Sequence, residues 1–284
     1  MYSMFTWLLL KFIVGCPLES LAADVKLYVK QMHDLKQYQA KKMTKCLHQA
    51  ILNLIRENNP DNPMQFSGGA LSEDDLKSAT DDILWNASVY TYQGALFTYF
   101  GEHVQNANTA IELGHNFLAE AMLAFPNIML DTFLKGVSCF AAARQTGRAK
   151  YAKIAKICQS KIKKWLKMGN PNVKHYDTFL DAEALAFKGK KSAIKHYEAA
   201  ILQAARSGYQ QDAALASERL AEYQLSVMND HVEGAFRLRE AERYWRGWGS
   251  IAKVQQLAAK YPKVFHTTHE IGEIFTLNDT DEGR

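Results

Sequence analysis

The sequence predicts an all-α fold, organised as a solenoid of stacked antiparallel helix pairs. Apolar residues recur at three-to-four spacing along most of the 284 residues, the period of helices that bury one face. The 16 glycines and 6 prolines are sparse and cluster between these periodic stretches, so the helices are long and their connections short. Few runs alternate Val, Ile or Thr with polar residues, which argues against a substantial sheet.

The first predicted helix begins in apolar sequence, MYSMFTWLLLKFIVGCPLESLAAD. This stretch resembles a secretory signal peptide, with small residues ahead of Ala23 as a cleavage site. However, no Lys or Arg precedes the apolar run, Lys11 interrupts it, and it is too short to span a bilayer. We interpret it as a buried helix that ends near Gly15, with a targeting role as the alternative. Such an apolar start also predicts that a preceding part of the fold is missing.

Further helices follow between turn signals. The stretch 58–69 is a loop with two prolines and paired glycines, and Ser72 then caps a helix whose first turn is acidic. The predicted helices are 2–13, 18–35, 39–57, 73–85, 88–100, 103–124, 127–145, 148–168, 176–188, 190–207, 211–228, 231–247 and 249–260. The predicted organisation is a helical repeat solenoid over 1–262, looser over 1–125 and clearest over 169–262, and a polar tail over 263–284. We expect the tail to be disordered.

The last third of the chain repeats itself. Residues 197–208 (YEAAILQAARSG) align with 238–249 (LREAERYWRGWG) after 41 residues, and 182–187 align with 217–222 after 35 residues. The difference falls in a connection between helices, so the unit is a helix pair of roughly 35–41 residues, typical of a solenoid. In each second helix, small residues flank a larger one and permit close packing. These packing positions are Ala193, Tyr197 and Ala200 in one pair and Gly234, Leu238 and Ala241 in the next.

Two segments of the repeats allow more than one interpretation. DAALASERLAEY, at 212–223, is predicted to be the first helix of a pair, with Leu215 and Leu220 inward. YWRGWG places Trp245 and Trp248 three residues apart, which suits a cation–π cage for a ligand. We favour packing, in which both tryptophans fill the end of the repeat and Gly249 terminates the helix.

The run from Gly169 to Pro262 resembles the tetratricopeptide-like helical region of large multi-domain signalling proteins. Those proteins combine a kinase-like domain, a predicted AAA/STAND-type ATPase, this helical region, and often sensor, histidine-kinase or cyclase domains. A looser resemblance extends back to about Leu18. The chain has no Walker A motif and no kinase glycine-rich loop, HRD or DFG set. The resemblance therefore implies only an interaction or relay segment, without catalytic residues.

A basic stretch provides the best local candidate for a partner surface. Between Arg144 and Lys167 there are nine basic residues and no acid, and apolar residues form a stripe at three-to-four spacing. Such an amphipathic helix can bind acidic partners, anionic lipid or nucleic acid, and the alternative is a solvated face of a solenoid helix. The candidate surface residues are Arg144, Arg148, Lys153, Lys156, Lys163 and Lys167. A further hypothesis assigns contacts with an acidic segment to Arg219, Arg237 and Arg239.

Other chemistry-bearing residues indicate no cofactor and no metal. His266 and His269 lack a third ligand nearby. The four cysteines form no CxxC pair and lie in apolar stretches, as expected for buried thiols in a reducing cytosol. Four glutamates recur through the repeats, and this recurrence favours inter-helix salt bridges over acid–base catalysis. They are Glu183, Glu198, Glu218 and Glu222.

The sequence predicts a cytoplasmic, non-enzymatic interaction or signal-relay module. Its partner is expected to be a protein, such as a signalling ATPase or kinase on the same or another chain. The first alternative is a regulatory fragment of such an ATPase or kinase. The second is a basic helical protein that binds nucleic acid or an anionic membrane surface, which the mild net charge of +4 does not by itself suggest.

Overall fold

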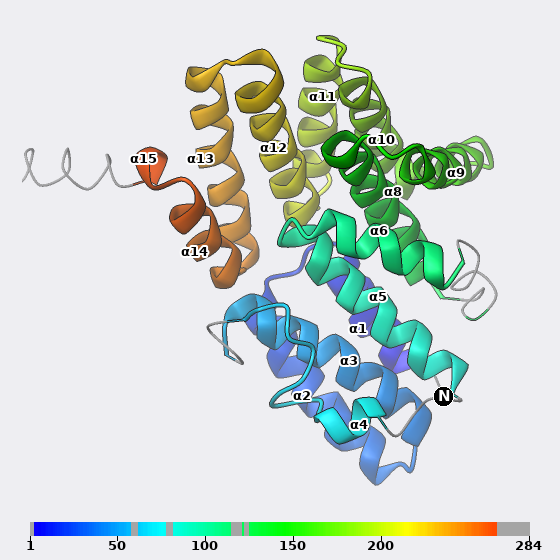
Figure 1. Cartoon of the computed structure of the whole chain (residues 1–284). Coiled ribbons are helices and arrows are strands. Elements are labelled where there is room, and N and C mark those ends of the chain that lie inside the picture. The colour runs from blue at the N-terminus through cyan, green and yellow to red at the C-terminus, as the bar shows by residue number, and fades with distance from the viewer. Residues whose placement is uncertain (1–2, 58–61, 78–81, 115–120, 122–124, 266–284) are drawn as a thin grey trace, which may run out of the picture.

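The structure, a computed structural model, describes residues 3–57, 62–77, 82–114, 121 and 125–265. Within these residues the chain forms helices and no strand, so the prediction of an all-α fold is confirmed (Figure 1). The α-helices are α1 (Ser3–Ile13), α2 (Leu18–Asp34), α3 (Tyr38–Ile55), α4 (Glu73–Lys77), α5 (Ile83–Tyr99), α6 (His103–Glu112), α8 (Asn127–Thr146), α9 (Ala149–Lys167), α10 (Lys174–Phe187), α11 (Ala193–Arg206), α12 (Gln210–Tyr223), α13 (His231–Trp248), α14 (Ile251–Lys260) and α15 (Pro262–Phe265). A 3-10 turn, η1 (Pro171–Val173), precedes α10, and a π-helical turn, η2 (Gln224–Met228), follows α12.

Three predicted helix boundaries are wrong. The helix predicted over 73–85 is the short α4, and α5 begins anew because the Asp82 carboxylate caps the backbone N–H of Trp85. The helix predicted over 103–124 ends, as α6, at Glu112; residues 115–120 and 122–124 lie outside the described part. The helix predicted over 211–228 changes to π geometry at 224–228. The predicted tail is described only to Phe265, where α15 ends.

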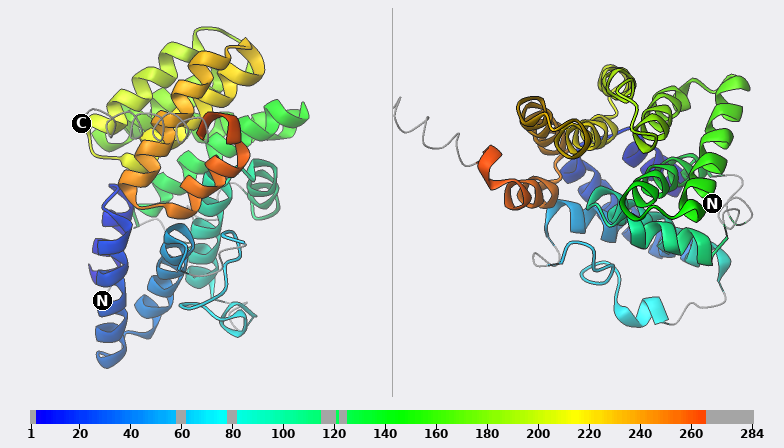
Figure 2. Two further views of the ribbon diagram at one scale, coloured as in Figure 1. Left: turned by 90° about the vertical axis from the view of Figure 1, so that its left-hand side faces the viewer. Right: turned by 45° about the horizontal axis from the view of Figure 1, so that its top comes forward.

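The helices from α8 to α13 form antiparallel pairs that pack side by side. α8 pairs with α9, α10 with α11, and α12 with α13, while α8 also contacts α10 and α11 contacts α12. The helices before α8 lie below this row in Figure 1, where α3 packs between α2 and α5. The two groups join through contacts of α5 and α6 with α8 and of α3 with α14, and Figure 2 shows the same arrangement from two other sides.

Helix α1 buries one face in the joint between the two groups. Phe5, Leu8 and Phe12 on this face are at most 1% exposed, whereas Trp7 on the opposite face is 41% exposed, so the prediction of a buried first helix holds for one face only. At its end, the Ile13 carbonyl accepts a 2.7 Å hydrogen bond from Gln211 Nε2 of α12. Gly15 follows with a positive φ of 79°, and a Cβ there would lie 2.9 Å from the Gly208 carbonyl oxygen. This close approach requires glycine. Over the described residues, no helix is both long and apolar enough to cross a membrane.

The predicted packing positions of the repeats lie in the core. Ala193, Tyr197, Ala200, Gly234, Leu238, Ala241, Trp245 and Trp248 are all buried. Both tryptophans are 0% exposed and touch aromatic rings of α1 and α5, so the alternative of a ligand cage is wrong. Gly249 adopts the left-handed conformation, and its N–H closes the helix on the carbonyls of Trp245 and Arg246.

Gly234 provides a test of the repeat packing. A Cβ at Gly234 would lie 2.6 Å from the Leu225 side chain, whereas a Cβ at Gly247 of the same helix meets only Gln210 Oε1, at 3.6 Å. We expect Gly234→Ala to lower the free energy of unfolding by about 1–3 kcal/mol through overpacking. Gly247→Ala is the matched control and should raise it by up to about 1 kcal/mol, because alanine favours helix. Urea unfolding followed by circular dichroism measures both, and equal effects would contradict the packing.

Candidate functional site

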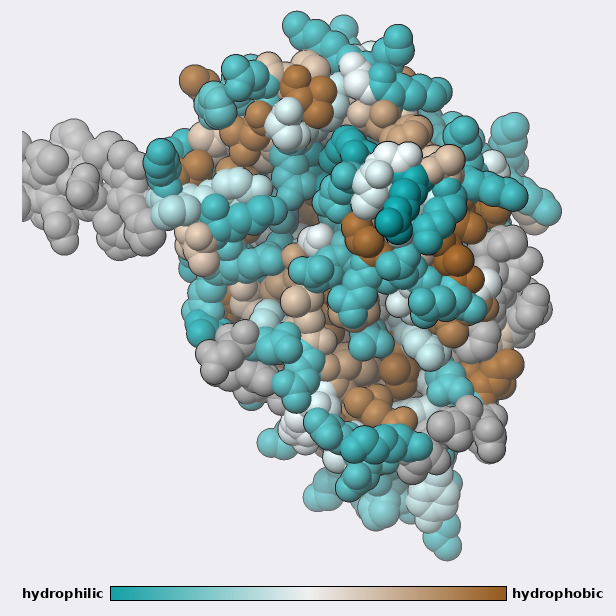
Figure 3. Space-filling model, viewed as in Figure 1, coloured by the Kyte–Doolittle hydropathy of each residue, from teal (hydrophilic) through white to brown (hydrophobic). Residues whose placement is uncertain are grey.

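Helix α9 lies at the edge of the row of helix pairs and exposes one face (Figure 1). Its inner stripe, which includes Tyr151, Ala155 and Ile162, is buried against α8 and α10. Burial also raises the pKa of Cys158 on this stripe to about 12, so this thiol is unreactive, as expected of a buried cysteine. On the face shown in Figure 3, apolar surface near α9 alternates with hydrophilic side chains.

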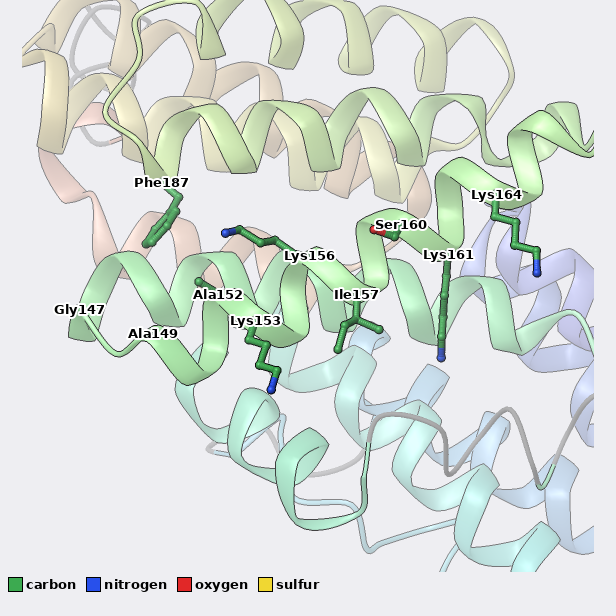
Figure 4. Close-up of a pocket in the computed structure, with 10 residues that line it drawn as sticks. All are labelled: Gly147, Ala149, Ala152, Lys153, Lys156, Ile157, Ser160, Lys161, Lys164 and Phe187. Atoms are coloured by element: carbon green, nitrogen blue, oxygen red, sulfur yellow. The ribbon is translucent and has the colours of Figure 1, made fainter.

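The exposed face of α9 forms one side of an open groove of about 760 Å³. Apolar atoms of Ala152, Ile157 and Phe187 line it, and Phe187 enters from the end of α10. Figure 4 shows Lys156 extending toward Phe187, while Lys153 extends on the same side of α9 as Ile157. The complete lining is Gly147, Ala149, Ala152, Lys153, Lys156, Ile157, Ser160, Lys161, Lys164 and Phe187. The groove therefore combines an apolar surface with four ammonium groups.

The structure brings together only part of the predicted basic surface. Lys153 and Lys156 line the groove, whereas Arg148 and Lys167 are exposed outside it. Lys161 and Lys164 also line it, and our sequence reasoning missed both. Lys161 and Lys164 follow Ile157 by four and seven residues, and this helical spacing places them on the same face of α9 as Ile157, which is the signal that would have found them.

Two predicted surface residues do not belong to the groove. Lys163 turns toward α10 and pairs with Asp181 and Asp177, at 2.8 and 3.7 Å. Arg144 points inward, where Nη1 lies 3.7 Å from the buried Glu183 carboxylate and the guanidinium lies over the Tyr223 ring. Both side chains pair with carboxylates of the protein itself, so Lys163 and Arg144 do not belong to the candidate partner surface.

A second charged cluster is buried between the helix pairs and α6. Arg219 of α12 is 1% exposed and binds the Glu183 carboxylate with two hydrogen bonds, of 2.7 and 3.1 Å. It also donates to Glu222 and lies 3.3 Å from His103 Nε2. The hypothesis that Arg219 contacts an acidic partner is therefore wrong, because the protein's own carboxylates occupy it.

The predicted inter-helix salt bridges are present for all four recurring glutamates. Glu183 pairs with Arg219, Glu198 with Arg237, Glu218 with Lys253, and Glu222 with Lys260. Glu218 and Lys253 are 7% and 0% exposed, so this pair is buried like the pair one repeat earlier. Arg237 is thus occupied, and Arg239 donates to the backbone carbonyl of Val264. Because both guanidinium groups already bind groups of the protein itself, the hypothesis that Arg237 and Arg239 contact an acidic partner is not supported.

The environment of the cluster shifts the pKa values of its members. Burial and then the Arg219 guanidinium lower the pKa of His103 to about 3, so this imidazole is neutral. Burial alone would raise the pKa of Glu183, but Arg219 and Arg144 hold it below its ordinary value. Burial lowers the pKa of Lys253, although Glu218 opposes this effect.

His103 also approaches a serine, in an arrangement that invites comparison with a nucleophile and its base. His103 Nδ1 lies 3.3 Å from Ser138 Oγ, and Thr98 Oγ1 lies 2.9 Å from the same hydroxyl. Ser138 is 0% and His103 3% exposed, so no substrate reaches either group. The neighbour of His103 on its other side is a cation rather than the carboxylate that a catalytic triad requires. These contacts position α6 against α8.

Comparisons with known protein families, with characterised proteins and with solved structures find no match to this chain. No group of three His, Cys, Asp or Glu residues in the described part of the chain could hold a metal ion. The pair His266 and His269, weighed above as partial metal ligands, lies outside the described residues.

The buried Arg219 pair predicts a large loss of stability. Arg219→Met keeps the bulk of the side-chain stem but removes both hydrogen bonds of the buried Glu183 carboxylate and leaves only Arg144, 3.7 Å away, as a cation beside it, so the free energy of unfolding should fall by about 3 kcal/mol. Adding Glu183→Gln should recover part of this loss, because the uncompensated charge is removed. Arg246→Met is the control, since Arg246 is 61% exposed and pairs with Glu242 on its own helix, and it should change stability by less than about 1 kcal/mol. Urea unfolding measures the loss of stability, and equal losses in Arg219→Met and Arg246→Met would contradict this role of Arg219.

His103 predicts a specific acid sensitivity. The unfolded chain binds a proton at this residue below its ordinary pKa of 6.5, whereas the folded protein does so only near 3. The stability that His103 contributes is therefore complete above pH 6.5 and is lost progressively as the pH falls toward 3. His103→Gln should reduce the slope of unfolding free energy between pH 6 and 5 by up to about 1.4 kcal/mol per pH unit. An unchanged slope in His103→Gln, measured by urea unfolding at several pH values, would refute the assignment.

Proposed function

We propose that this protein is a non-catalytic interaction or signal-relay module whose partner surface is the groove beside α9. The observation that carries the proposal is the combination of apolar lining and lysines in that groove. Within the described part of the chain, Lys153, Lys156 and Lys164 have no acidic partner, although the helices contain many ion pairs. These three lysines are therefore free to pair with acidic groups of another molecule, and they lie beside an apolar surface that such a molecule could also contact.

The interpretation of the fold as a tetratricopeptide-like solenoid is part of the proposal. Its support is the recurrence of one buried contact. Glu183 binds Arg219 of the next first helix, and Glu218 binds Lys253 of the first helix after that, over 36 and 35 residues. The recurrence matches the 35-residue shift seen in the sequence and is what stacked equivalent units produce. In this interpretation the protein acts as a cytoplasmic relay segment. The helical region of the signalling ATPases and kinases that the sequence resembles would have the same role. The alternative, a regulatory fragment of such a protein, would use the same surface.

The chemistry of the groove selects an acidic amphipathic helix as the partner element. Apolar side chains of such a helix would pack on Ala152, Ile157 and Phe187, and its carboxylates would meet the lysines on either side. The second candidate is binding to nucleic acid or an anionic membrane surface, which the row of lysines also favours. Phosphate contacts alone leave the apolar lining unused, so the peptide is the better fit.

A charge-reversal series tests the partner surface. Peptides selected for binding to the immobilised protein should be rich in Asp and Glu spaced among Leu, Ile or Phe. Lys153→Glu, Lys156→Glu and Lys164→Glu together should weaken their binding by at least about a hundredfold, because three attractions become repulsions. The matched control is Lys26→Glu, Lys30→Glu and Lys195→Glu, which makes the same change in net charge at exposed sites on α2 and α11.

The two triple variants and two further probes decide between the candidates. Equal binding of the selected peptides by both variants, in fluorescence anisotropy, would reject the groove. A labelled DNA duplex or phosphatidylserine vesicles bound more tightly than every selected peptide, with loss only in the α9 variant, would favour the second candidate. Binding to either should then fall steeply with added salt.

A further inference from the structure

A second cavity, of about 420 Å³, lies at the opposite end of α10 from the groove. It forms where η1 and the start of α10 meet the end of α11 and the turn into α12. Its lining is Pro171, Asn172, Lys174, His175, Gln203, Arg206, Ser207 and Tyr209. None of these residues lines the α9 groove, so the two sites are separate.

A buried carboxylate fixes one wall of this cavity. His175 Nε2 lies 2.9 Å from Asp212 Oδ2, and the two side chains are 5% and 0% exposed. The imidazole stacks on Tyr209, with ring centroids 4.3 Å apart. The ring orientation is therefore set from two sides, and Nδ1 is the ring nitrogen left to meet a ligand.

The remaining lining supplies positive charge and hydrogen-bond donors. Lys174 and Arg206 are exposed, and neither has an acidic partner within the residues that the structure describes. No carboxylate belongs to the lining. Gln203 Oε1 already accepts a 3.0 Å hydrogen bond from Thr178, which leaves the Gln203 amide N–H groups for the cavity. The Ser207 hydroxyl adds another donor.

We propose that this cavity binds the phosphate group of a small phosphorylated molecule. Two cations, an imidazole held by a carboxylate, an amide and a hydroxyl offer more donors than a carboxylate ligand can use. A phosphate group carries close to two negative charges and three acceptor oxygens, which matches this set. The volume lies in the range of small-molecule pockets, and the ring of Tyr209, which stacks on His175, adds apolar surface for the rest of the ligand. The proposal is independent of the α9 groove.

Calorimetric titration of the full chain with inorganic phosphate and with glucose 6-phosphate tests the proposal. Lys174→Gln with Arg206→Gln changes only exposed side chains and should weaken binding of both probes by at least about tenfold. His175→Gln should also weaken binding, because the donor held by Asp212 is lost. The control, Lys195→Gln with Arg243→Gln, removes two exposed cations elsewhere and should bind both probes like the unaltered protein. Equal melting temperatures of the two double variants would show that the loss of binding is not caused by unfolding.

Three outcomes would overturn the assignment. The first is no binding of either probe up to about 20 mM, or equal binding by the cavity variant and the control variant. The second is binding of acetate or citrate as tight as that of glucose 6-phosphate, which would remove the preference for phosphate. The third is tighter binding of a phosphoserine peptide than of glucose 6-phosphate, which would identify a protein side chain rather than a small molecule as the source of the phosphate.

Discussion

The buried guanidinium of Arg219 is the constraint on which the interior depends. It joins Glu183 of α10, Glu222 of its own helix and His103 of α6, where α6, α10 and α12 meet. A buried ion pair stabilises a protein little more than apolar residues of similar volume would. Removing one member is nevertheless costly, because the other member would remain charged and buried away from water. The pair therefore acts mainly on geometry: it fixes the register of α10 against α12 and holds α6 over both.

This constraint explains where a partner can and cannot bind. Stacked helix pairs usually offer one long face to a ligand, but here the chain's own helices cover the face that carries Arg219 and Lys253. His103 of α6 contacts Arg219, and the Lys253 ammonium lies 5.7 Å from the centre of the Phe100 ring after α5. Tyr99 packs edge-on against Trp245 in the same region. The two cavities lined by exposed basic residues consequently lie away from this face, beside α9 and at the start of α10.

The sequence allowed the pairs of helices to be predicted, because glycine, proline and small residues mark turns and close contacts locally. The roles of Gly249 at a helix end and of Ala193 in a helix contact could be predicted from the residues near them in the sequence. Arg219 could not be placed in the same way. Periodicity separates an inner from an outer face only when one side of a helix meets water, and α12 is buried almost all round. Lys163 and Arg144 were misplaced for a related reason: the acids that attract them lie on α10, 18 and 39 positions further along the chain.

The two proposed sites share one structural element, α10. Its last residue, Phe187, lines the groove, and its first two, Lys174 and His175, line the phosphate cavity. These ends are about 20 Å apart in a 14-residue helix, and Glu183 lies between them, held by Arg219. Because that buried pair opposes sliding of α10 against α12, occupation of one site is transmitted to the other only if the pair is strained or broken. The structure therefore predicts sites that bind independently in the intact protein, and measuring glucose 6-phosphate affinity with and without a saturating groove peptide would show a dependence only if α10 moves.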